Sequence, residues 1–217
     1  MSSETHASTT LAEALAKHSI SLPDEQVELI DQYCHLLWEW NAKLNLTRHL
    51  DYDTFVARDV IDSMQLASCL SDRERVLDFG SGGGVPGMLI GILRPRVRLT
   101  LADSIEKKAS ALSDMVERLG LSTKVVASRV QDLLPKKRFE TIVARAVGPT
   151  AKVLKWVEPH WNYFGRMLLI KGPRWVEERK EARHLGLMAQ TNLRCLKSYP
   201  MPGTESESVI LCFTRKG

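Results

Sequence analysis

Hydrophobic side chains change their spacing twice along the chain. Up to about residue 70 they recur three and four positions apart, which is the period of a helix that buries one face. From residue 75 to about residue 171, short apolar runs alternate with helical patterns, as in βαβ units around a parallel sheet. Beyond Trp175 a further helical pattern precedes two apolar runs that residues 200–207 separate. These last runs predict an antiparallel pair of strands that closes the sheet.

The first zone predicts helices. Leu11 and Leu15 indicate one or two short helical turns, and Ser21 followed by Pro23 predicts a longer helix that Ser21 caps. A further helix is expected from about residue 54 to residue 69. The apolar face of the longer helix consists of Val27, Ile30, Cys34, Leu37 and Leu44.

The second and third zones predict seven strands with helices between them, one of which begins near Pro86 and another of which covers residues 175–187. We therefore expect an α/β fold with a mostly parallel seven-stranded sheet and an N-terminal helical extension. Residues 1–10 are expected to form a disordered tail, 11–70 the extension and 71–217 the α/β domain, with the last two in one compact unit. The expected strands are 75–79, 97–102, 124–127, 141–144, 167–171, 193–199 and 208–214.

Composition excludes several classes of protein. Hydrophobic residues make up 44% and charged residues 26% of the 217 positions, which is typical of a globular domain. The first ten residues lack the features of a secretory signal, and no segment approaches the roughly 18 apolar residues of a membrane span. The four cysteines and six histidines form no metal-ligand pattern. We expect a cytoplasmic monomer with reduced thiols and with neither a membrane nor a metal as partner.

A glycine-rich loop follows the first expected strand. Asp78 ends the strand, and glycines at 80, 82, 83, 84 and 87 lead into the next helix. Glycines let the backbone approach a ligand closely, and a helix start presents free N–H groups. Gly82, Gly84 and Gly87 also satisfy the dinucleotide pattern Gly-x-Gly-x-x-Gly. Both a dinucleotide and S-adenosylmethionine would place their ribose hydroxyls on an acid at the end of the second strand, where Asp103 stands.

Asp78 favours S-adenosylmethionine over a dinucleotide. A carboxylate at this position would lie near the pyrophosphate of a dinucleotide, where negative charge is unfavourable, whereas it suits an amino group and a sulfonium. The sequence therefore predicts a Rossmann-like, class I methyltransferase, with an NAD-dependent dehydrogenase as one alternative. A second interpretation of Asp78 is that it only accepts hydrogen bonds from amides of the loop.

Basic residues stand near the expected edge of the active site. Arg145 ends the fourth strand, where a second substrate meets the cofactor in an open α/β sheet. Its guanidinium could bind a carboxylate or a phosphate bidentately, or simply be solvated. The net charge is only +4, so the clustering of basic residues after the glycine loop matters more. We expect phosphate contacts at the carboxyl edge of the sheet from Lys136, Lys137, Lys171 and Arg174.

These residues resemble the glucose-inhibited division protein B family, bacterial enzymes that methylate guanine N7 in the 530 loop of 16S ribosomal RNA. The resemblance implies S-adenosylmethionine as cofactor and 16S ribosomal RNA or the small ribosomal subunit as partner. It runs from about residue 38 to residue 216. The motifs that carry it begin at Trp38, Asn45, Arg58, Asp78, Asp103, Ser128, Ala144 and Lys171.

The resemblance also implies roles for single residues. It implies cofactor contacts at Gly80, Val85, Val130, Gln131 and Arg145, and it places Arg58 in a motif expected to contact RNA. Arg145 is the expected catalytic residue. Two positions depart from the family: Asp59 stands where a histidine is usual, and Gln131 where an acid is common.

Two other functions remain open from the sequence alone. One is a small-molecule methyltransferase, since this fold serves many substrates. The other is a non-catalytic RNA-binding module that keeps a cofactor pocket. Guanine N7 carries a free lone pair at neutral pH, so its methylation needs no general base. The lack of an activated Cys, a His pair or a metal pattern is compatible with that reaction.

Overall fold

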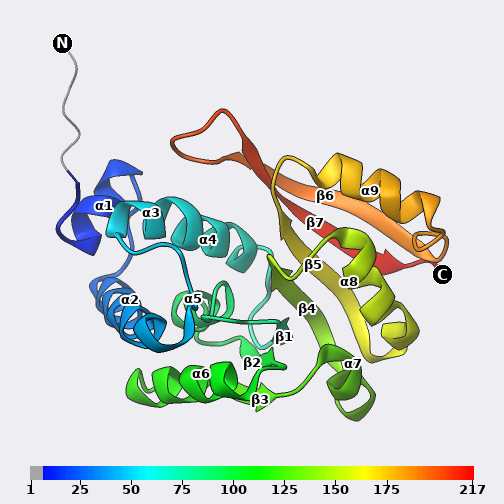
Figure 1. Cartoon of the computed structure of the whole chain (residues 1–217), viewed down its shortest axis with the longest axis horizontal. Helices are drawn as coiled ribbons and strands as arrows, with labels where there is room; N and C mark the ends of the chain where they lie inside the picture. The colour runs from blue at the N-terminus through cyan, green and yellow to red at the C-terminus, as the bar shows by residue number, and fades with distance from the viewer. Residues whose placement is uncertain (1–6) are drawn as a thin grey trace.

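A computed structural model describes residues 7–217 as one twisted seven-stranded sheet between two layers of helices (Figure 1). The strand order is β3-β2-β1-β4-β5-β7-β6. Strands β1 to β5 are parallel, whereas β7 pairs antiparallel with both β5 and β6. The strands are β1 Arg75–Phe79, β2 Arg98–Asp103, β3 Lys124–Ala127, β4 Phe139–Arg145, β5 Phe164–Lys171, β6 Thr191–Pro200 and β7 Glu207–Arg215.

All seven expected strands are present, and the antiparallel closing pair is confirmed. Strands β1 and β3 have the expected bounds, and the others differ by one to three residues at an end. The apolar runs locate the strands because the central ones are buried on both faces, as the burial of β1, β2 and β4 shows.

The N-terminal helices are α1 Leu11–Lys17, α2 Asp24–Leu44, α3 Tyr52–Phe55 and α4 Ile61–Ala67. A π-helical segment, η1 Val56–Val60, joins α3 to α4, so the one helix expected there has a wide turn in its middle. The expectation that Ser21 caps the long helix is wrong. That helix begins at Asp24, and Pro23 takes the cap position without a side-chain hydrogen bond.

The expected N-terminal tail is too long. Ser8 donates from its backbone N and its Oγ to the carboxylate of Asp53, at 2.9 and 2.6 Å. Thr10 and Glu13 form a capping box that starts α1. Residues 8–10 are therefore held against the protein, while residues 1–6 of the expected tail lie outside the described residues.

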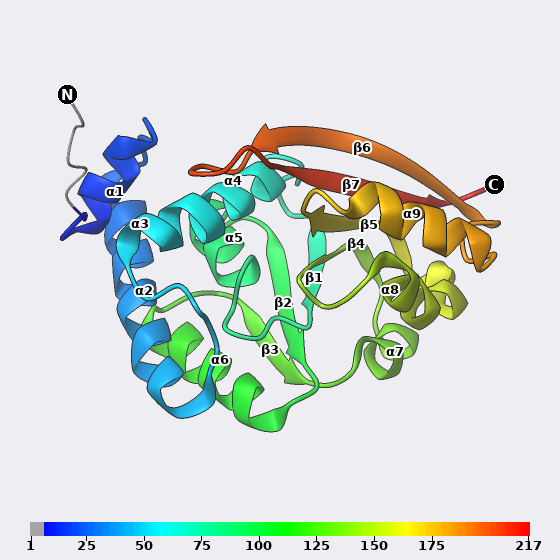
Figure 2. The same ribbon diagram turned by 45° about the horizontal axis from the view of Figure 1, so that its top comes forward.

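The remaining helices cover both faces of the sheet (Figures 1 and 2). Helices α1 to α6 share one hydrophobic cluster with β1 and β2, and α7, α8 and α9 share another with β4, β5 and β7. Between residues 7 and 217 no helix is long and apolar enough to cross a membrane. The bounds are α5 Gly87–Leu93, α6 Glu106–Arg118, α7 Val130–Leu133, η2 Leu134–Lys136, α8 Thr150–Val157, η3 Glu158–Tyr163 and α9 Trp175–His184.

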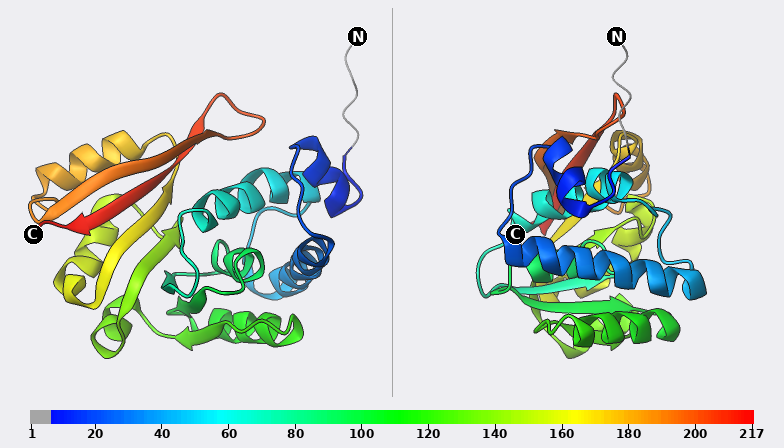
Figure 3. Two further views of the ribbon diagram at one scale, coloured as in Figure 1. Left: turned by 180° about the vertical axis from the view of Figure 1, so that it is seen from behind. Right: turned by 90° about the vertical axis from the view of Figure 1, so that its left-hand side faces the viewer.

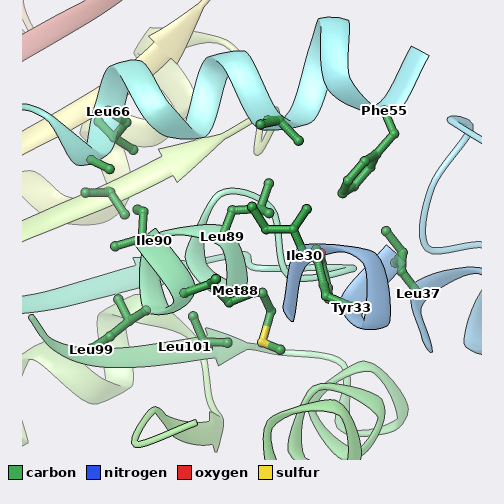
Figure 4. Packing of buried hydrophobic residues seen from close by; sticks show 14 of the residues in the cluster. Ile30, Tyr33, Leu37, Phe55, Leu66, Met88, Leu89, Ile90, Leu99 and Leu101 are labelled. Carbon is green, nitrogen blue, oxygen red and sulfur yellow. The ribbon is translucent and has the colours of Figure 1, made fainter. Parts of the chain in front are cut away.

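The N-terminal helices pack directly on the helix that follows the glycine loop. In Figure 4, Ile30 and Tyr33 of α2 lie beside Met88 and Leu89 of α5, with Phe55 above them. Viewed from the side, α2 crosses the outside of this layer (Figure 3). The extension thus shares the core that positions the glycine loop.

Candidate active site

A cavity of about 370 Å³ opens at the carboxyl edge of the sheet, where the first four strands end. Parallel strands bring the residues that follow them to one edge, so segments at the ends of four strands contribute to its wall, and α8 adds Trp156. The wall consists of Phe79, Gly80, Asp103, Ser104, Ile105, Ser128, Arg129, Val130, Gln131, Val147 and Trp156.

A hydrogen bond joins the glycine loop to the N-terminal extension. The hydroxyl of Tyr33, fully buried in α2, donates to the carbonyl oxygen of Gly83 at 2.9 Å. Gly84 adopts φ +105°, and a Cβ there would collide with Met88 and lie 3.0 Å from the Tyr33 hydroxyl. Only glycine accepts this backbone conformation and this close approach together. The extension therefore determines where the loop lies.

Asp103 lies at the cavity wall and also fixes the loop. One carboxylate oxygen accepts the N–H of Gly82 at 2.9 Å, and the other accepts the N–H of Ile105 at 2.8 Å. Each carboxylate oxygen has two acceptor sites, so Asp103 retains capacity for two hydroxyl groups. Its position at the end of β2 is the one expected of a ribose ligand.

Asp78 lies beneath the loop, and the residues that line the cavity do not include it. It is 1% exposed, and one carboxylate oxygen accepts the N–H of Gly87 at 3.1 Å. The other oxygen is buried without a partner among residues 7–217. Burial raises the pKa of Asp78 to about 7, although Ser81, Gly87 and Arg145 oppose the shift. The structure shows the amide contact of the second interpretation.

The other expected cofactor residues divide into two groups. Gly80, Val130 and Gln131 line the cavity, whereas Val85 packs against the N-terminal hydrophobic cluster. Gly82 and Gly84 shape the loop behind the wall. Sequence reasoning missed Ile105 and Val147, which follow strand ends and could have been found on that ground. It also missed Trp156 of α8, for which no local pattern gives a signal.

Arg145 is bound by carboxylates of its own chain. Its guanidinium donates to Asp59 and, at 3.2 Å, to Asp62, and it also reaches the backbone oxygen of Arg58 at 3.0 Å. The side chain is 19% exposed, and Asp59 is buried. Burial alone would lower the pKa of Arg145. The charges of Asp59 and Asp62 outweigh that effect, so the pKa of Arg145 is raised. Arg145 thus joins β4 to the π-helical segment by binding two separate carboxylates of its own chain, and it is not among the residues that line the cavity.

His49 and Tyr199 complete this charged cluster. The Nδ1 atom of His49 lies 2.9 Å from Oδ2 of Asp59, the carboxylate oxygen that Arg145 does not bind. The hydroxyl of Tyr199 donates to Asp62 at 2.7 Å. Burial raises the pKa of Asp62, against the effect of Arg145. Asp59 is the position at which the sequence resemblance predicts a histidine, and in this chain His49 from the preceding loop contacts it.

The expected phosphate-binding residues do not share one edge. The prediction that Lys136 and Lys137 flank the carboxyl edge is wrong, because they immediately precede β4 and so lie at its amino end. Lys171 is at the carboxyl edge, but its ammonium donates to Glu178 and to the Gly148 oxygen, both at 2.7 Å. Arg174 is exposed at the start of α9. Arg58 has a buried guanidinium nitrogen without a partner in the described part of the chain.

Comparisons with known proteins find relatives over most of the chain. The GidB family, described as rRNA small subunit methyltransferase G, matches residues 26–202. The ribosomal RNA small subunit methyltransferase G of Rhodopirellula baltica is 46% identical over 194 residues, which are 89% of this chain and 84% of that protein.

Two solved structures share the fold. TrmN from Thermus thermophilus matches with a TM-score of 0.52 and 19% identity over 72% of this chain and 48% of its own, so this chain spans about half of its length. TrmK of M. capricolum, solved with S-adenosyl-homocysteine, matches with a TM-score of 0.54 and 11% identity over 71% of this chain and 67% of its own. At these identities the likeness concerns the fold alone.

Proposed function

Since the chain belongs to the rRNA small subunit methyltransferase G family, we propose that it methylates N7 of a guanine in the 530 loop of 16S ribosomal RNA. The family establishes an enzyme that transfers methyl groups to small-subunit ribosomal RNA from S-adenosylmethionine. The target atom and the RNA segment are the parts that we propose. The observation that carries the proposal is the cavity at the carboxyl edge, which has Asp103 in its wall and also Val147, two positions after Arg145 of the charged cluster.

The cavity residues fit the donor. Asp103 would bind the ribose hydroxyls, and the apolar side chains of Ile105, Val130 and Trp156 offer walls for the flat adenine ring. Gly80 leaves the backbone open to close approach at the end of β1, where φ is +67°. When bound, the cofactor supplies a methyl group on a positively charged sulfur.

The charged cluster suits a reaction at guanine N7. The lone pair of N7 attacks without prior loss of a proton, so the protein has to orient the base and exclude water. Such positioning contributes roughly 7–11 kcal/mol when the reacting atoms are well aligned. Positive charge develops on the purine, and Asp59 and Asp62 outnumber the guanidinium of Arg145 in this cluster. We propose that Arg145 positions these carboxylates and does not bind a phosphate.

Arg174 is the best placed of the expected phosphate contacts, because it is exposed near the carboxyl end of β5. Lys171 orders the loop through Gly148 and Glu178, and Arg58 contributes its backbone to the Arg145 network. We also propose that the chain acts as a monomer in the cytoplasm, where it meets ribosomal RNA. Its exposed large hydrophobic side chains come from four different segments: Leu50, Ile105, Leu185 and Leu196.

Methyl transfer to defined RNA tests this proposal. The protein is incubated with tritiated S-adenosylmethionine and 16S ribosomal RNA that lacks the modification, and the RNA is then digested to nucleosides. We expect one labelled product, 7-methylguanosine, which fragment mapping assigns to the 530 loop. A different labelled nucleoside would reject N7 as the target. Cofactor binding without transfer to free RNA or to small subunits would reject the proposal; binding of 16S ribosomal RNA would then indicate the non-catalytic module, and its lack a small-molecule methyltransferase.

A further inference from the structure

A second groove, of about 360 Å³, lies at the amino edge of the sheet. Strands β1 to β4 begin there, whereas the cofactor cavity lies where they end. We call it the amino-edge groove and define it by its cations and its apolar floor. Val97, Leu99 and Phe139 contribute to the floor. The cations are Arg75, Arg96, Arg98, Lys124 and Lys137.

Carboxylates balance only part of this charge. Glu140 lies 3.4 Å from Arg75, and Asp72 lies 3.2 Å from Arg96. Within residues 7–217, no ion pair involves Arg98, Lys124 or Lys137.

Lys137 shows how the cations affect one another. Its ammonium donates to Thr100 Oγ1 at 3.3 Å and lies 5.2 Å from the centre of the Phe139 ring. Partial burial lowers the pKa of Lys137, and the positive charge of Lys124 lowers it further. Cations that lie close together in a groove repel one another, which raises the electrostatic energy of the folded protein. A bound anion would lower that energy.

We propose that the amino-edge groove binds backbone phosphates of a second segment of the RNA substrate, apart from the segment that presents the target base. This inference rests on the proposed function. Neighbouring strands lie about 4.8 Å apart, so the starts of β3, β2, β1 and β4 span roughly 14 Å. A row of cations of that length matches successive phosphates of a strand better than one small anion. Phosphate contacts of this kind add affinity and orientation without reading sequence.

RNA binding by a charge-neutralised variant tests the proposal. The double variant Arg98→Gln with Lys124→Gln removes two cations that form no ion pair within residues 7–217, so the substitutions break no ion pair of the folded protein. The control is Arg194→Gln with Lys180→Gln, which removes the same charge from exposed positions on β6 and α9. Dissociation constants for 16S ribosomal RNA are measured between 50 and 300 mM KCl, and cofactor affinity is measured in parallel.

We expect the groove variant to bind RNA about tenfold more weakly near 150 mM salt. The slope of log K against log salt should fall in magnitude by about 1.4 to 1.8, the value for two lost phosphate contacts. Cofactor affinity should stay unchanged, because the groove lies at the opposite edge of the sheet. Equal losses in the control, or an unchanged slope in the groove variant, would overturn the proposal.

Two further arms separate the other outcomes. Inorganic phosphate and ATP are tested as competitors; displacement of the RNA by either at micromolar concentration would reassign the groove to a small phosphorylated ligand. The wild type is assayed for 7-methylguanosine in the same RNA. Failure of that assay refutes the proposed function, whereas normal methylation with an unaltered salt slope in the variant refutes only the groove.

Discussion

Asp78 shows how one buried carboxyl can support a binding loop without touching the ligand cavity. Its contact with the Gly87 N–H ties the end of β1 to the start of α5, across the whole glycine loop. Its second oxygen has no partner in the described residues. The sequence offered this contact only as a second interpretation of Asp78, because the contact depends on how the loop folds back over the strand.

The raised pKa of Asp78 predicts a pH dependence of stability. The folded chain binds a proton here up to about pH 7, whereas a typical unfolded Asp loses it near pH 4. Between these values the folded state holds more protons, so this group lowers the free energy of unfolding as pH rises, by about 4 kcal/mol at most. Asn at this position keeps an acceptor for Gly87 and removes the titration. Urea unfolding from pH 4 to pH 7 should show Asp78→Asn gaining stability relative to wild type as pH rises. Parallel pH profiles would contradict the prediction.

The strands were predictable and the charged cluster was not, for a physical reason. An apolar run records burial at its own position, so β1 and β3 could be placed to the residue. Arg145 and Asp59 lie 86 positions apart, and no local pattern reports their contact. The π-helical turn was missed because helical periodicity does not distinguish one wide turn. Lys136 and Lys137 were assigned to the wrong edge although the expected fourth strand, residues 141–144, begins after them, so the sequence itself places them at the amino end of β4.

The ion pairs that join β4 to η1 and α4 predict a large effect of removing Arg145. Arg145→Ala would leave the buried carboxylate of Asp59 with His49 as its remaining side-chain partner, so we expect a loss of up to about 3–5 kcal/mol in the free energy of unfolding. The Arg145→Ala, Asp59→Asn double variant should lose less than the sum of the single variants, by about 1–3 kcal/mol. Arg75→Ala is the control: its pair with Glu140 is half-exposed on both sides, and we expect at most about 1 kcal/mol. Additive losses in the urea unfolding of all four proteins would show that the cluster is not coupled.

At the scale of the whole molecule, the N-terminal extension belongs to the core that supports the cofactor cavity. Its buried side chains share a cluster with β1, β2 and α5. The indole N–H of Trp40 in α2 donates to Asp114 of α6 at 2.7 Å. At the other end, Tyr199 and Lys197 of β6 bond to Asp62 and Ser68, which brings the β6–β7 hairpin against α4 (Figures 1 and 3). The helical extension therefore contacts α6, which packs on β2 and β3, and also the β6–β7 hairpin at the other end of the sheet.

This arrangement predicts that the extension and the sheet open together. In native-state hydrogen exchange, the slowest amides of α2 and of β4 should report the same free energy of opening, since separating α2 exposes the cluster beneath α5. S-adenosylmethionine at a hundred times its dissociation constant should raise both values by about 2.7 kcal/mol, because the Tyr33 hydroxyl holds the loop that borders the cavity. Tyr33→Phe removes that bond while keeping the ring, so it should weaken cofactor binding with little change in apo exchange at β4. If α2 opened at lower free energy than β4 and gained no protection from the cofactor, the extension would be a separate unit that covers the domain without supporting its site.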